Sequence, residues 1–103
     1  MTPLDCVIIG GGPAGCSAAT WAAQLGLAVA LVERASQPCA TLGALDFEQD
    51  WVLGHGHTSL AAVGRAVADH AQSVPGVHWH LGSAAVGLDR PDGHWRVALA
   101  DGR

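Results

Sequence analysis

Three glycines near the N-terminus have the spacing that binds the diphosphate of a dinucleotide. Gly10, Gly12 and Gly15 form a Gly-x-Gly-x-x-Gly pattern, with Pro13 and Ala14 inside it. Gly10 allows a tight turn, Gly12 has no Cβ to hold a diphosphate away from the backbone, and Gly15 allows close packing of a helix. The N–H groups at the start of that helix, with the positive end of its dipole, would bind an anion.

A carboxylate follows these glycines at the distance where a ribose is recognised. Glu33 lies roughly 20 residues past the turn, where this motif places an acid that accepts hydrogen bonds from the adenosine ribose hydroxyls. Such a carboxylate favours an unmodified ribose, because it would repel a 2′-phosphate. Arg34 is a residue type that can hold a 2′-phosphate, but beside Glu33 we interpret it as a solvated neighbour.

The flanking pattern predicts the elements that such a motif requires. Residues 6–9 are an apolar run, an alanine-rich helix is expected from about residue 13 to residue 25, and Gly26 would end it. Residues 28–32 are a second apolar run, typical of a parallel strand covered on both faces. Glycine turns also join strands to helices without any ligand, but strand, helix, returning strand and terminal acid together favour dinucleotide binding.

Residues 35–58 show no clear periodicity and predict a long loop. A loop of this length in a compact domain usually binds something. Its simplest use is to wrap the far end of the dinucleotide, with Phe47 and Trp51 as packing anchors. We interpret the acids in this loop, among them Asp46 and Glu48, as solvated, because they lack the ligand spacing of a calcium site.

The second half predicts a helix, a third parallel strand and a hairpin. Thr58 or Ser59 would be the N-cap of a helix that packs on the sheet, and residues 75–76 would stop it. Residues 77–81 predict the third strand, and residues 84–88 and 95–99 predict two more strands joined by a Pro-Asp-Gly turn. The apolar stripe of the helix comprises Leu60, Val63, Val67, Ala71 and Val74. The expected fold class is α/β, a Rossmann-like parallel sheet with flanking helices and a C-terminal antiparallel hairpin.

Composition limits the class of protein and its partners. At 103 residues the chain is one domain at most, and 14% of its residues are charged, against about 25% in an average soluble domain. We therefore expect surface covered by a cofactor, by further polypeptide or by a second subunit, as in a homodimer. The net charge is −4 and the five basic residues are scattered, which argues against a nucleic-acid partner. No apolar run approaches a membrane span and no signal peptide is indicated, so a cytoplasmic location is expected.

Other groups of reactive side chains predict no catalytic centre. Cys6 and Cys16 are expected to be buried, and Cys39, in the loop, is the one cysteine whose position leaves exposure open. The histidines of His-Gly-His (55–57) and His-Trp-His (78–80) match no familiar zinc pattern, so we interpret them as loop and solvent-facing strand residues. No serine nucleophile motif is present either.

The first third of the sequence resembles a known family. Residues 7–15, the following Ser-Ala-Ala (17–19) and the terminal Glu33 look like the N-terminal FAD-binding segment of flavoproteins with two dinucleotide-binding domains. The spacing through Asp50 and Gly54 to Leu60, and on to the turn at Gly93, is most similar to the thioredoxin reductase-like branch of the pyridine nucleotide-disulfide oxidoreductases.

This resemblance implies a role for each matching residue. Glu33 with Arg34 would line the adenosine ribose, Asp50 would sit where the family often has an asparagine near the flavin, and the backbone at Ala84 and Ala85 would meet the adenine edge. The residues implied to hold the FAD diphosphate are Gly10, Gly12, Pro13, Ala14 and Gly15.

The resemblance also implies a function for a longer protein. Residues 1–103 would be a FAD-binding domain, the incomplete N-terminal portion of an NAD(P)H-dependent flavoprotein oxidoreductase that passes electrons from nicotinamide through flavin to a disulfide or another acceptor. The family's NAD(P)H domain and its redox Cys-x-x-Cys have no counterpart in these residues. Two alternatives stay open: a FAD-dependent monooxygenase or thiol oxidase, and a non-catalytic dinucleotide-binding module.

Overall fold

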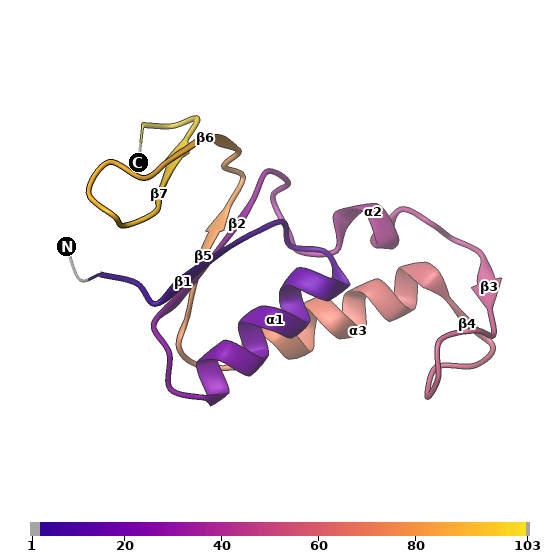
Figure 1. Ribbon diagram of the computed structural model, residues 1–103. Coiled ribbons are helices and arrows are strands. Elements are labelled where there is room, and N and C mark those ends of the chain that lie inside the picture. The colour runs from indigo at the N-terminus through magenta and orange to yellow at the C-terminus, as the bar shows by residue number, and fades with distance from the viewer. Residues whose placement is uncertain (1–2, 103) are drawn as a thin grey trace.

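A three-stranded parallel sheet forms the centre of the protein, which we describe from a computed structural model over residues 3–102. Its strands are β1 (Cys6–Ile9), β2 (Val29–Glu33) and β5 (Val77–Leu81), in the order β1-β2-β5 (Figure 1). In register, Cys6 lies opposite Val29, which lies opposite Val77. The first four residues of β2 are all buried, because this strand has a neighbour on each side and is covered on both faces. The two apolar runs and the third strand predicted from the sequence are confirmed.

Two helices cover one face of this sheet. Helix α1 (Pro13–Gln24) joins β1 to β2, and helix α3 (Leu60–Ser73) leads into β5. Gly26 adopts a positive φ of 83° directly after the first helix, as predicted for a helix C-terminus. The core between the helices and the sheet is built on small side chains, which allow close approach. Its buried members are Cys16, Cys39, Ala68 and Ala71, with Leu42, Val67 and Trp79 packed against them.

Helix α3 begins and packs largely as predicted. The Ser59 hydroxyl accepts a hydrogen bond from the amide of Ala62 at 3.1 Å, so Ser59, and not Thr58, is the N-cap. The helix buries more of its surface than the predicted stripe, because it also packs against α2 (Ala40–Gly43). A Cβ added at Gly64 would lie 3.1 Å from the amide nitrogen of Gly43. Close contact between the two helices therefore depends on a glycine.

The prediction of an irregular loop over residues 35–58 is wrong in part. The segment contains α2 and an antiparallel pair of two-residue strands, β3 (Glu48–Gln49) and β4 (Thr58–Ser59). These elements are too short to leave a periodic signal in the sequence. Phe47 and Trp51 are 48% and 66% exposed, so neither is buried in the core, and their predicted role as anchors against the dinucleotide stays a prediction. The two rings contact each other, with centroids 6.2 Å apart.

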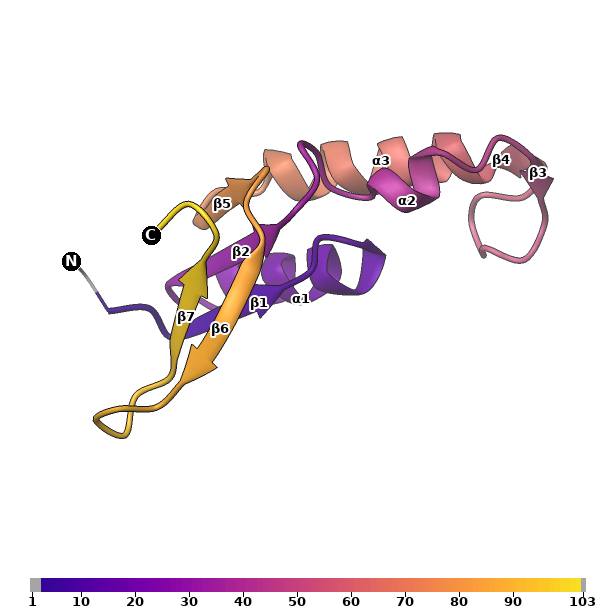
Figure 2. The ribbon, with the colours of Figure 1, turned by 90° about the horizontal axis from the view of Figure 1, so that it is seen from above.

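The C-terminal hairpin is confirmed. Strands β6 (Ala85–Asp89) and β7 (Arg96–Leu99) pair antiparallel, and Gly93 in the connecting turn has a φ of 78°. Figure 2 shows this hairpin on the side of the parallel sheet opposite to α1 and α3. The molecule therefore has a helical layer, a parallel sheet and a hairpin layer.

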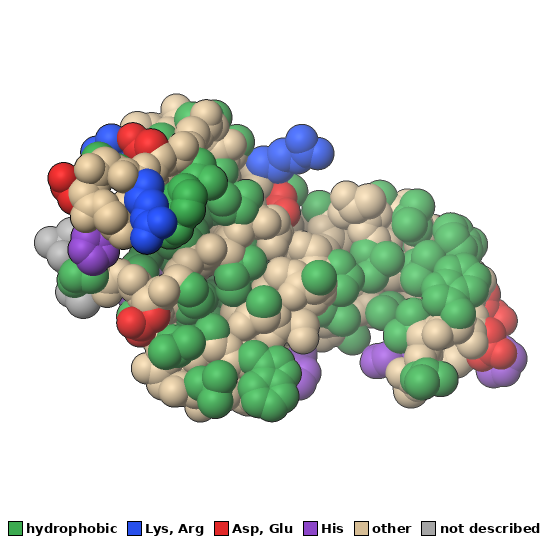
Figure 3. Space-filling view, in the orientation of Figure 1, with side chains coloured by type: hydrophobic (Ala, Val, Ile, Leu, Met, Phe, Trp, Pro, Cys, Tyr) green, Lys and Arg blue, Asp and Glu red, His purple; other side chains and the backbone are tan. Residues whose placement is uncertain are grey.

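Much of the surface is apolar, as the low share of charged residues predicts. Large hydrophobic side chains are exposed on α1, on the hairpin and in the β3–β4 loop, where Leu53 is 95% exposed. Figure 3 shows hydrophobic side chains gathered over the end of the molecule that β3 and β4 form. Of the helices in residues 3–102, none combines the length and the apolar character needed to cross a bilayer. Cover by further polypeptide or by a second subunit stays a prediction.

Candidate functional site

The three motif glycines form one compact turn between β1 and α1. Gly10 has a φ of 106°, and its amide donates a hydrogen bond to the Val32 carbonyl at 2.8 Å, which ties the turn to β2. A Cβ on Gly15 would overlap the carbonyl oxygen of Gly10, so the helix can lie against the turn only with glycine there. A Cβ on Gly12 would meet no atom within 4 Å. The space in front of Gly12 is therefore open to a ligand.

The first turn of α1 offers backbone donors to that space. Gly12 is the N-cap in an extended conformation, no side chain caps the helix, and Pro13 occupies its first turn. The amide of Cys16 is bonded to the Gly12 carbonyl at 2.9 Å, whereas the amides of Ala14 and Gly15 precede the first intrahelical bond. With the positive end of a 12-residue helix behind them, these amides are groups that can donate to an anion such as a phosphate.

Glu33 lies beside this turn and helps to hold it. Its Oε1 accepts a hydrogen bond from the Gly11 amide at 2.9 Å, and its Oε2 accepts one from the Ala35 amide at 2.6 Å. A carboxylate oxygen has room for more than one hydrogen bond, so both oxygens can still accept bonds from ribose hydroxyls. The sequence predicted the ribose contact alone. It did not predict that Glu33 also clamps the glycine turn to the chain that leaves β2.

A cavity of about 380 Å³ opens over these groups, which is within the usual range of ligand pockets, roughly 300–1,000 Å³. It brings together four of the residues predicted to bind a dinucleotide: Gly12, Pro13, Glu33 and Arg34. The sequence analysis missed the other wall, formed by Ala35 and by the start of α2: Cys39, Ala40, Thr41 and Leu42. A second cavity, of about 280 Å³ between α1 and α3, has no carboxylate or arginine in its lining.

Ala85 lies near this cavity but does not line it. The Gly82 amide donates to the Ala35 carbonyl at 2.7 Å, and the Ser83 amide donates to the Glu33 carbonyl at 3.0 Å. These bonds bring the chain after β5 alongside Glu33, and Ala85 then begins β6 as a half-buried residue. The implied contact of its backbone with adenine stays a prediction.

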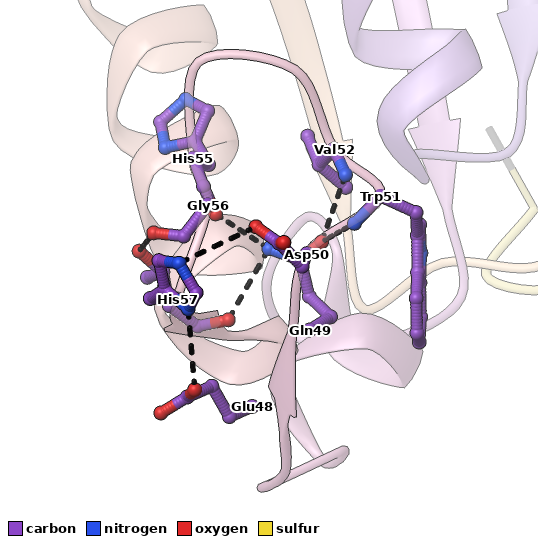
Figure 4. Close-up of polar contacts among 9 residues, drawn as sticks. Glu48, Gln49, Asp50, Trp51, Val52, His55, Gly56 and His57 are labelled. Atoms are coloured by element: carbon purple, nitrogen blue, oxygen red, sulfur yellow. Dashed lines mark hydrogen bonds and ion pairs between the residues drawn. The ribbon is translucent and has the colours of Figure 1, made fainter.

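Asp50 lies outside the cavity, in the loop between β3 and β4. Its Oδ1 is 4.0 Å from Nε2 of His57, and Oε1 of Glu48 is 3.6 Å from Nδ1 of the same imidazole (Figure 4). All three side chains are at least 70% exposed, so these contacts contribute little to stability. The contact with flavin that the resemblance implies for Asp50 stays a prediction.

The histidines do not meet at a common centre. In residues 3–102, no three side chains of histidine, cysteine, aspartate or glutamate are placed to hold a metal ion. His78 is exposed, as predicted, but His80 is half-buried, and its Nδ1 is buried without a hydrogen-bond partner within the described residues. Because alternate residues of a strand face opposite ways, and Trp79 packs into the helical layer, His80 faces the side where the hairpin lies.

Cys39, for which the sequence left exposure open, is buried, with a relative exposure of 4%. Its amide donates to the Gly11 carbonyl at 2.8 Å, and the thiol of Cys16 donates to the same oxygen at 3.4 Å. This shared acceptor draws both cysteines behind the glycine turn. Cys16 is buried as predicted, whereas Cys6, predicted to be buried, is half-buried.

Burial should make both of these thiols unreactive. It raises the pKa of the Cys16 thiol to about 12, with further contributions from Cys39 and Glu33, and burial also raises the pKa of Cys39. Because a thiolate is the reactive form, we expect iodoacetamide at about pH 8.5 to label Cys16 on the order of a thousandfold more slowly in folded than in unfolded protein. Peptide mass spectrometry, with Cys6 as the internal control, measures this ratio. Equal labelling of all three cysteines in folded protein would show that the pair is accessible.

The raised pKa of the Cys16 thiol also predicts that the folded protein becomes less stable at alkaline pH. Unfolded thiols release their protons near their ordinary pKa, while the folded Cys16 keeps its proton up to about pH 12. Between these two values the unfolded state binds fewer protons, so the free energy of unfolding falls as pH rises. Urea titrations at several pH values measure the free energy of unfolding. Its fall with rising pH should be smaller in Cys16→Ala than in the parent chain.

Glu33→Gln is expected to weaken the turn itself. One of the two backbone amides would face the new NH₂ group and lose its acceptor. Since hydrogen bonds to charged groups contribute about 1.5–3 kcal/mol, we expect a loss of about 1–3 kcal/mol in the free energy of unfolding. Asp5→Asn is the matched control, because Asp5 accepts a single backbone bond, from Ala28, at an exposed site. Urea unfolding with equal, small effects for both variants would contradict the clamp.

Comparison with protein-family models identifies the family of this chain. The model of the pyridine nucleotide-disulphide oxidoreductase family matches residues 4–103. The thioredoxin reductase of T. acidophilum superposes with a TM-score of 0.82 at 27% identity, over 96% of this chain and 31% of that one. The Gloeobacter violaceus thioredoxin reductase gives a TM-score of 0.77 at 27% identity, over 96% of this chain and 32% of that one.

A third structure is similar in fold. The thioredoxin reductase of Lactococcus lactis superposes with a TM-score of 0.83 at 23% identity, over 96% of this chain and 31% of that one. The chain thus spans about a third of the length of these solved proteins. No curated protein sequence matches the chain.

Proposed function

Because the chain belongs to the pyridine nucleotide-disulphide oxidoreductase family, we propose that it is the FAD-binding portion of a flavoprotein oxidoreductase. Its residues 1–103 would form the N-terminal part of the FAD domain, which further polypeptide completes. The observation that carries this proposal is the cavity that joins an uncapped helix N-terminus, an open glycine face and a carboxylate. These are the groups that a pyrophosphate and a ribose require.

The residues present fit the adenosine-diphosphate end of FAD. The amides of Ala14 and Gly15 would donate to the pyrophosphate, and the open face of Gly12 would allow its close approach. The carboxylate of Glu33, already fixed by two backbone amides, would accept from the ribose hydroxyls. The exposed Arg34 would border the same ribose.

In the complete enzyme, we propose that NAD(P)H supplies electrons that reach a disulfide or another acceptor. The isoalloxazine of FAD supplies the redox chemistry when it is bound, and the protein supplies binding, orientation and electrostatics. This chain's own part is to fix the adenosine end, so that the other end of the cofactor has a defined place. NADPH consumption with a disulfide acceptor would support this role in the longer polypeptide. Release of peroxide without any need for pyridine nucleotide would favour a thiol oxidase.

Calorimetric titration of the chain tests the binding proposal. We expect FAD and ADP to bind at one site, and ADP-ribose to bind at least about tenfold more tightly than 2′-phospho-ADP-ribose, because Glu33 repels the added phosphate. Inorganic phosphate at equal ionic strength is the control for non-specific anion binding. Absence of heat with both FAD and ADP would refute FAD binding by this chain. Equal affinity for the two ribose forms would refute the role of Glu33.

A further inference from the structure

Two buried cysteines meet behind the glycine turn. Cys16, in the first half of α1, is 1% exposed, and Cys39, directly before α2, is 4% exposed. The Gly11 carbonyl accepts a hydrogen bond from the Cys39 amide at 2.8 Å and one from the Cys16 thiol at 3.4 Å. Both side chains belong to the same core cluster. The fold therefore brings together two cysteines that are far apart in the sequence.

The two thiols also interact with each other. Burial is the main cause of their raised pKa values, and a hydrogen bond between the two thiols adds to the rise for Cys16 and opposes it for Cys39. The thiols are therefore within hydrogen-bond reach. Only cysteines that are such close neighbours can be joined by a disulfide without movement of the backbone. Cys6, by contrast, is half-buried at the end of β1 that lies away from the glycine turn.

We propose that Cys16 and Cys39 form a disulfide when the chain folds in the presence of a disulfide oxidant such as oxidised glutathione. One cysteine thiolate attacks a sulfur of the oxidant, which breaks the S–S bond of the oxidant, forms a mixed disulfide and releases one glutathione thiolate. The second cysteine attacks the protein sulfur of the mixed disulfide, which forms the Cys16–Cys39 bond and releases a second glutathione. The two cysteines lose two electrons and two protons, and two molecules of reduced glutathione carry them away.

Burial determines when this reaction can take place. In the folded chain both thiols hold their protons and are closed off from solvent, so exchange with an external disulfide is slow. In the unfolded chain the same thiols ionise near their ordinary pKa and are accessible. Folding then places them side by side and covers the new bond. The redox state in which the chain folds is thus kept in the folded protein.

The bond would join two elements that border the cavity over the glycine turn. Cys39 lines this cavity from the beginning of α2, and Cys16 lies on α1 just after Gly12 and Pro13, which line it from the other side. The bond needs no ligand in the cavity, so it goes beyond the proposed function and is independent of it. By linkage, the factor by which folding favours the disulfide is also the factor by which the disulfide favours folding.

The test is refolding of the parent chain from urea in a buffer of reduced and oxidised glutathione, with disulfides mapped by peptide mass spectrometry. We expect Cys16–Cys39 as the main internal disulfide of the refolded chain. In urea we expect Cys6–Cys16 instead, because the shorter loop closes more readily. Relative to glutathione, the Cys16–Cys39 bond should be favoured on the order of a hundredfold more in the folded chain than in urea.

Cys6→Ala is the matched variant, because it removes the competing thiol and keeps the pair. Its oxidised and reduced forms should unfold at different urea concentrations, with the oxidised form the more stable. Cys16→Ala should leave Cys39 without an internal partner, so that no Cys6–Cys39 bond forms in the refolded chain. If either variant fails to fold, the disulfides of the parent chain decide the question alone.

Each outcome supports the proposal or overturns it. A change of the main pairing from Cys6–Cys16 in urea to Cys16–Cys39 after refolding supports it. The same mixture of pairings in urea and after refolding overturns it, as does a refolded chain in which only Cys6 is oxidised. An oxidised form of Cys6→Ala that is less stable than its reduced form also overturns it, because the fold would then oppose the bond.

Discussion

Gly12→Val is expected to abolish binding of FAD and ADP while leaving the fold intact. A Cβ added to Gly12 would meet no protein atom within 4 Å, so the branched valine side chain would project into the space proposed for the pyrophosphate. The backbone of Gly12, at φ −75° and ψ −173°, is extended and suits a β-branched residue. We expect affinity to fall at least about a hundredfold, and the loss of a favourable N-cap to cost no more than about 1 kcal/mol.

Calorimetry with both ligands measures the first effect, and urea unfolding measures the second. Gly43→Val is the matched control, because a Cβ there also meets nothing within 4 Å, and Gly43 does not line the cavity. Its affinity for ADP should equal that of the parent chain. Unaltered binding by Gly12→Val would mean that the pyrophosphate does not approach this turn.

Gly15→Ala is expected to unfold the protein or nearly so. The added methyl group would overlap the carbonyl oxygen of Gly10 and lie 3.0 Å from its carbonyl carbon. Both are backbone atoms, and Gly10 is fixed by its hydrogen bond to Val32. Since overpacking that displaces backbone commonly costs about 1–3 kcal/mol and occasionally more, we expect a loss of about 3 kcal/mol or more from a domain of ordinary stability.

The comparison that isolates this effect is Gly12→Ala, which adds the same atoms three residues earlier, where space is open. Circular dichroism and urea unfolding of the two alanine variants should differ sharply. Equal stability would show that α1 can move away from the turn at little cost, and the close packing assigned to Gly15 would be wrong.

The parts of the fold that could be predicted from the sequence are those with long local patterns. The three parallel strands, α1, α3 and the hairpin each show an apolar run, a helical period or a turn signal of their own. Helix α2 and the β3–β4 pair could not be predicted, because four-residue and two-residue elements leave no period. They exist through contacts from distant residues, such as the Ala61 amide on the Leu45 carbonyl.

The candidate site, like the fold, has features that the sequence predicted and features that it did not. The spacing of Gly12 and Glu33 predicted two residues that the fold places around one cavity. The burial of Cys39 had no local signal, since it depends on the Gly11 carbonyl, which folding brings to the Cys39 amide. The Glu33–Gly11 bond joins residues 22 positions apart. Sequence spacing identified residues of the candidate site better than it identified the groups that hold them in place.

The central claim is that backbone amides at the start of α1, with Glu33 beside them, bind the diphosphate of a dinucleotide. A titration of the ¹⁵N-labelled chain with ADP, followed by amide chemical shifts, tests it residue by residue. We expect the largest shifts at Gly12, Ala14, Gly15 and Ala35, with saturation at one equivalent, and no shifts in β7. Shifts confined to the hairpin or to the groove between α1 and α3, with the turn amides unmoved, would contradict it.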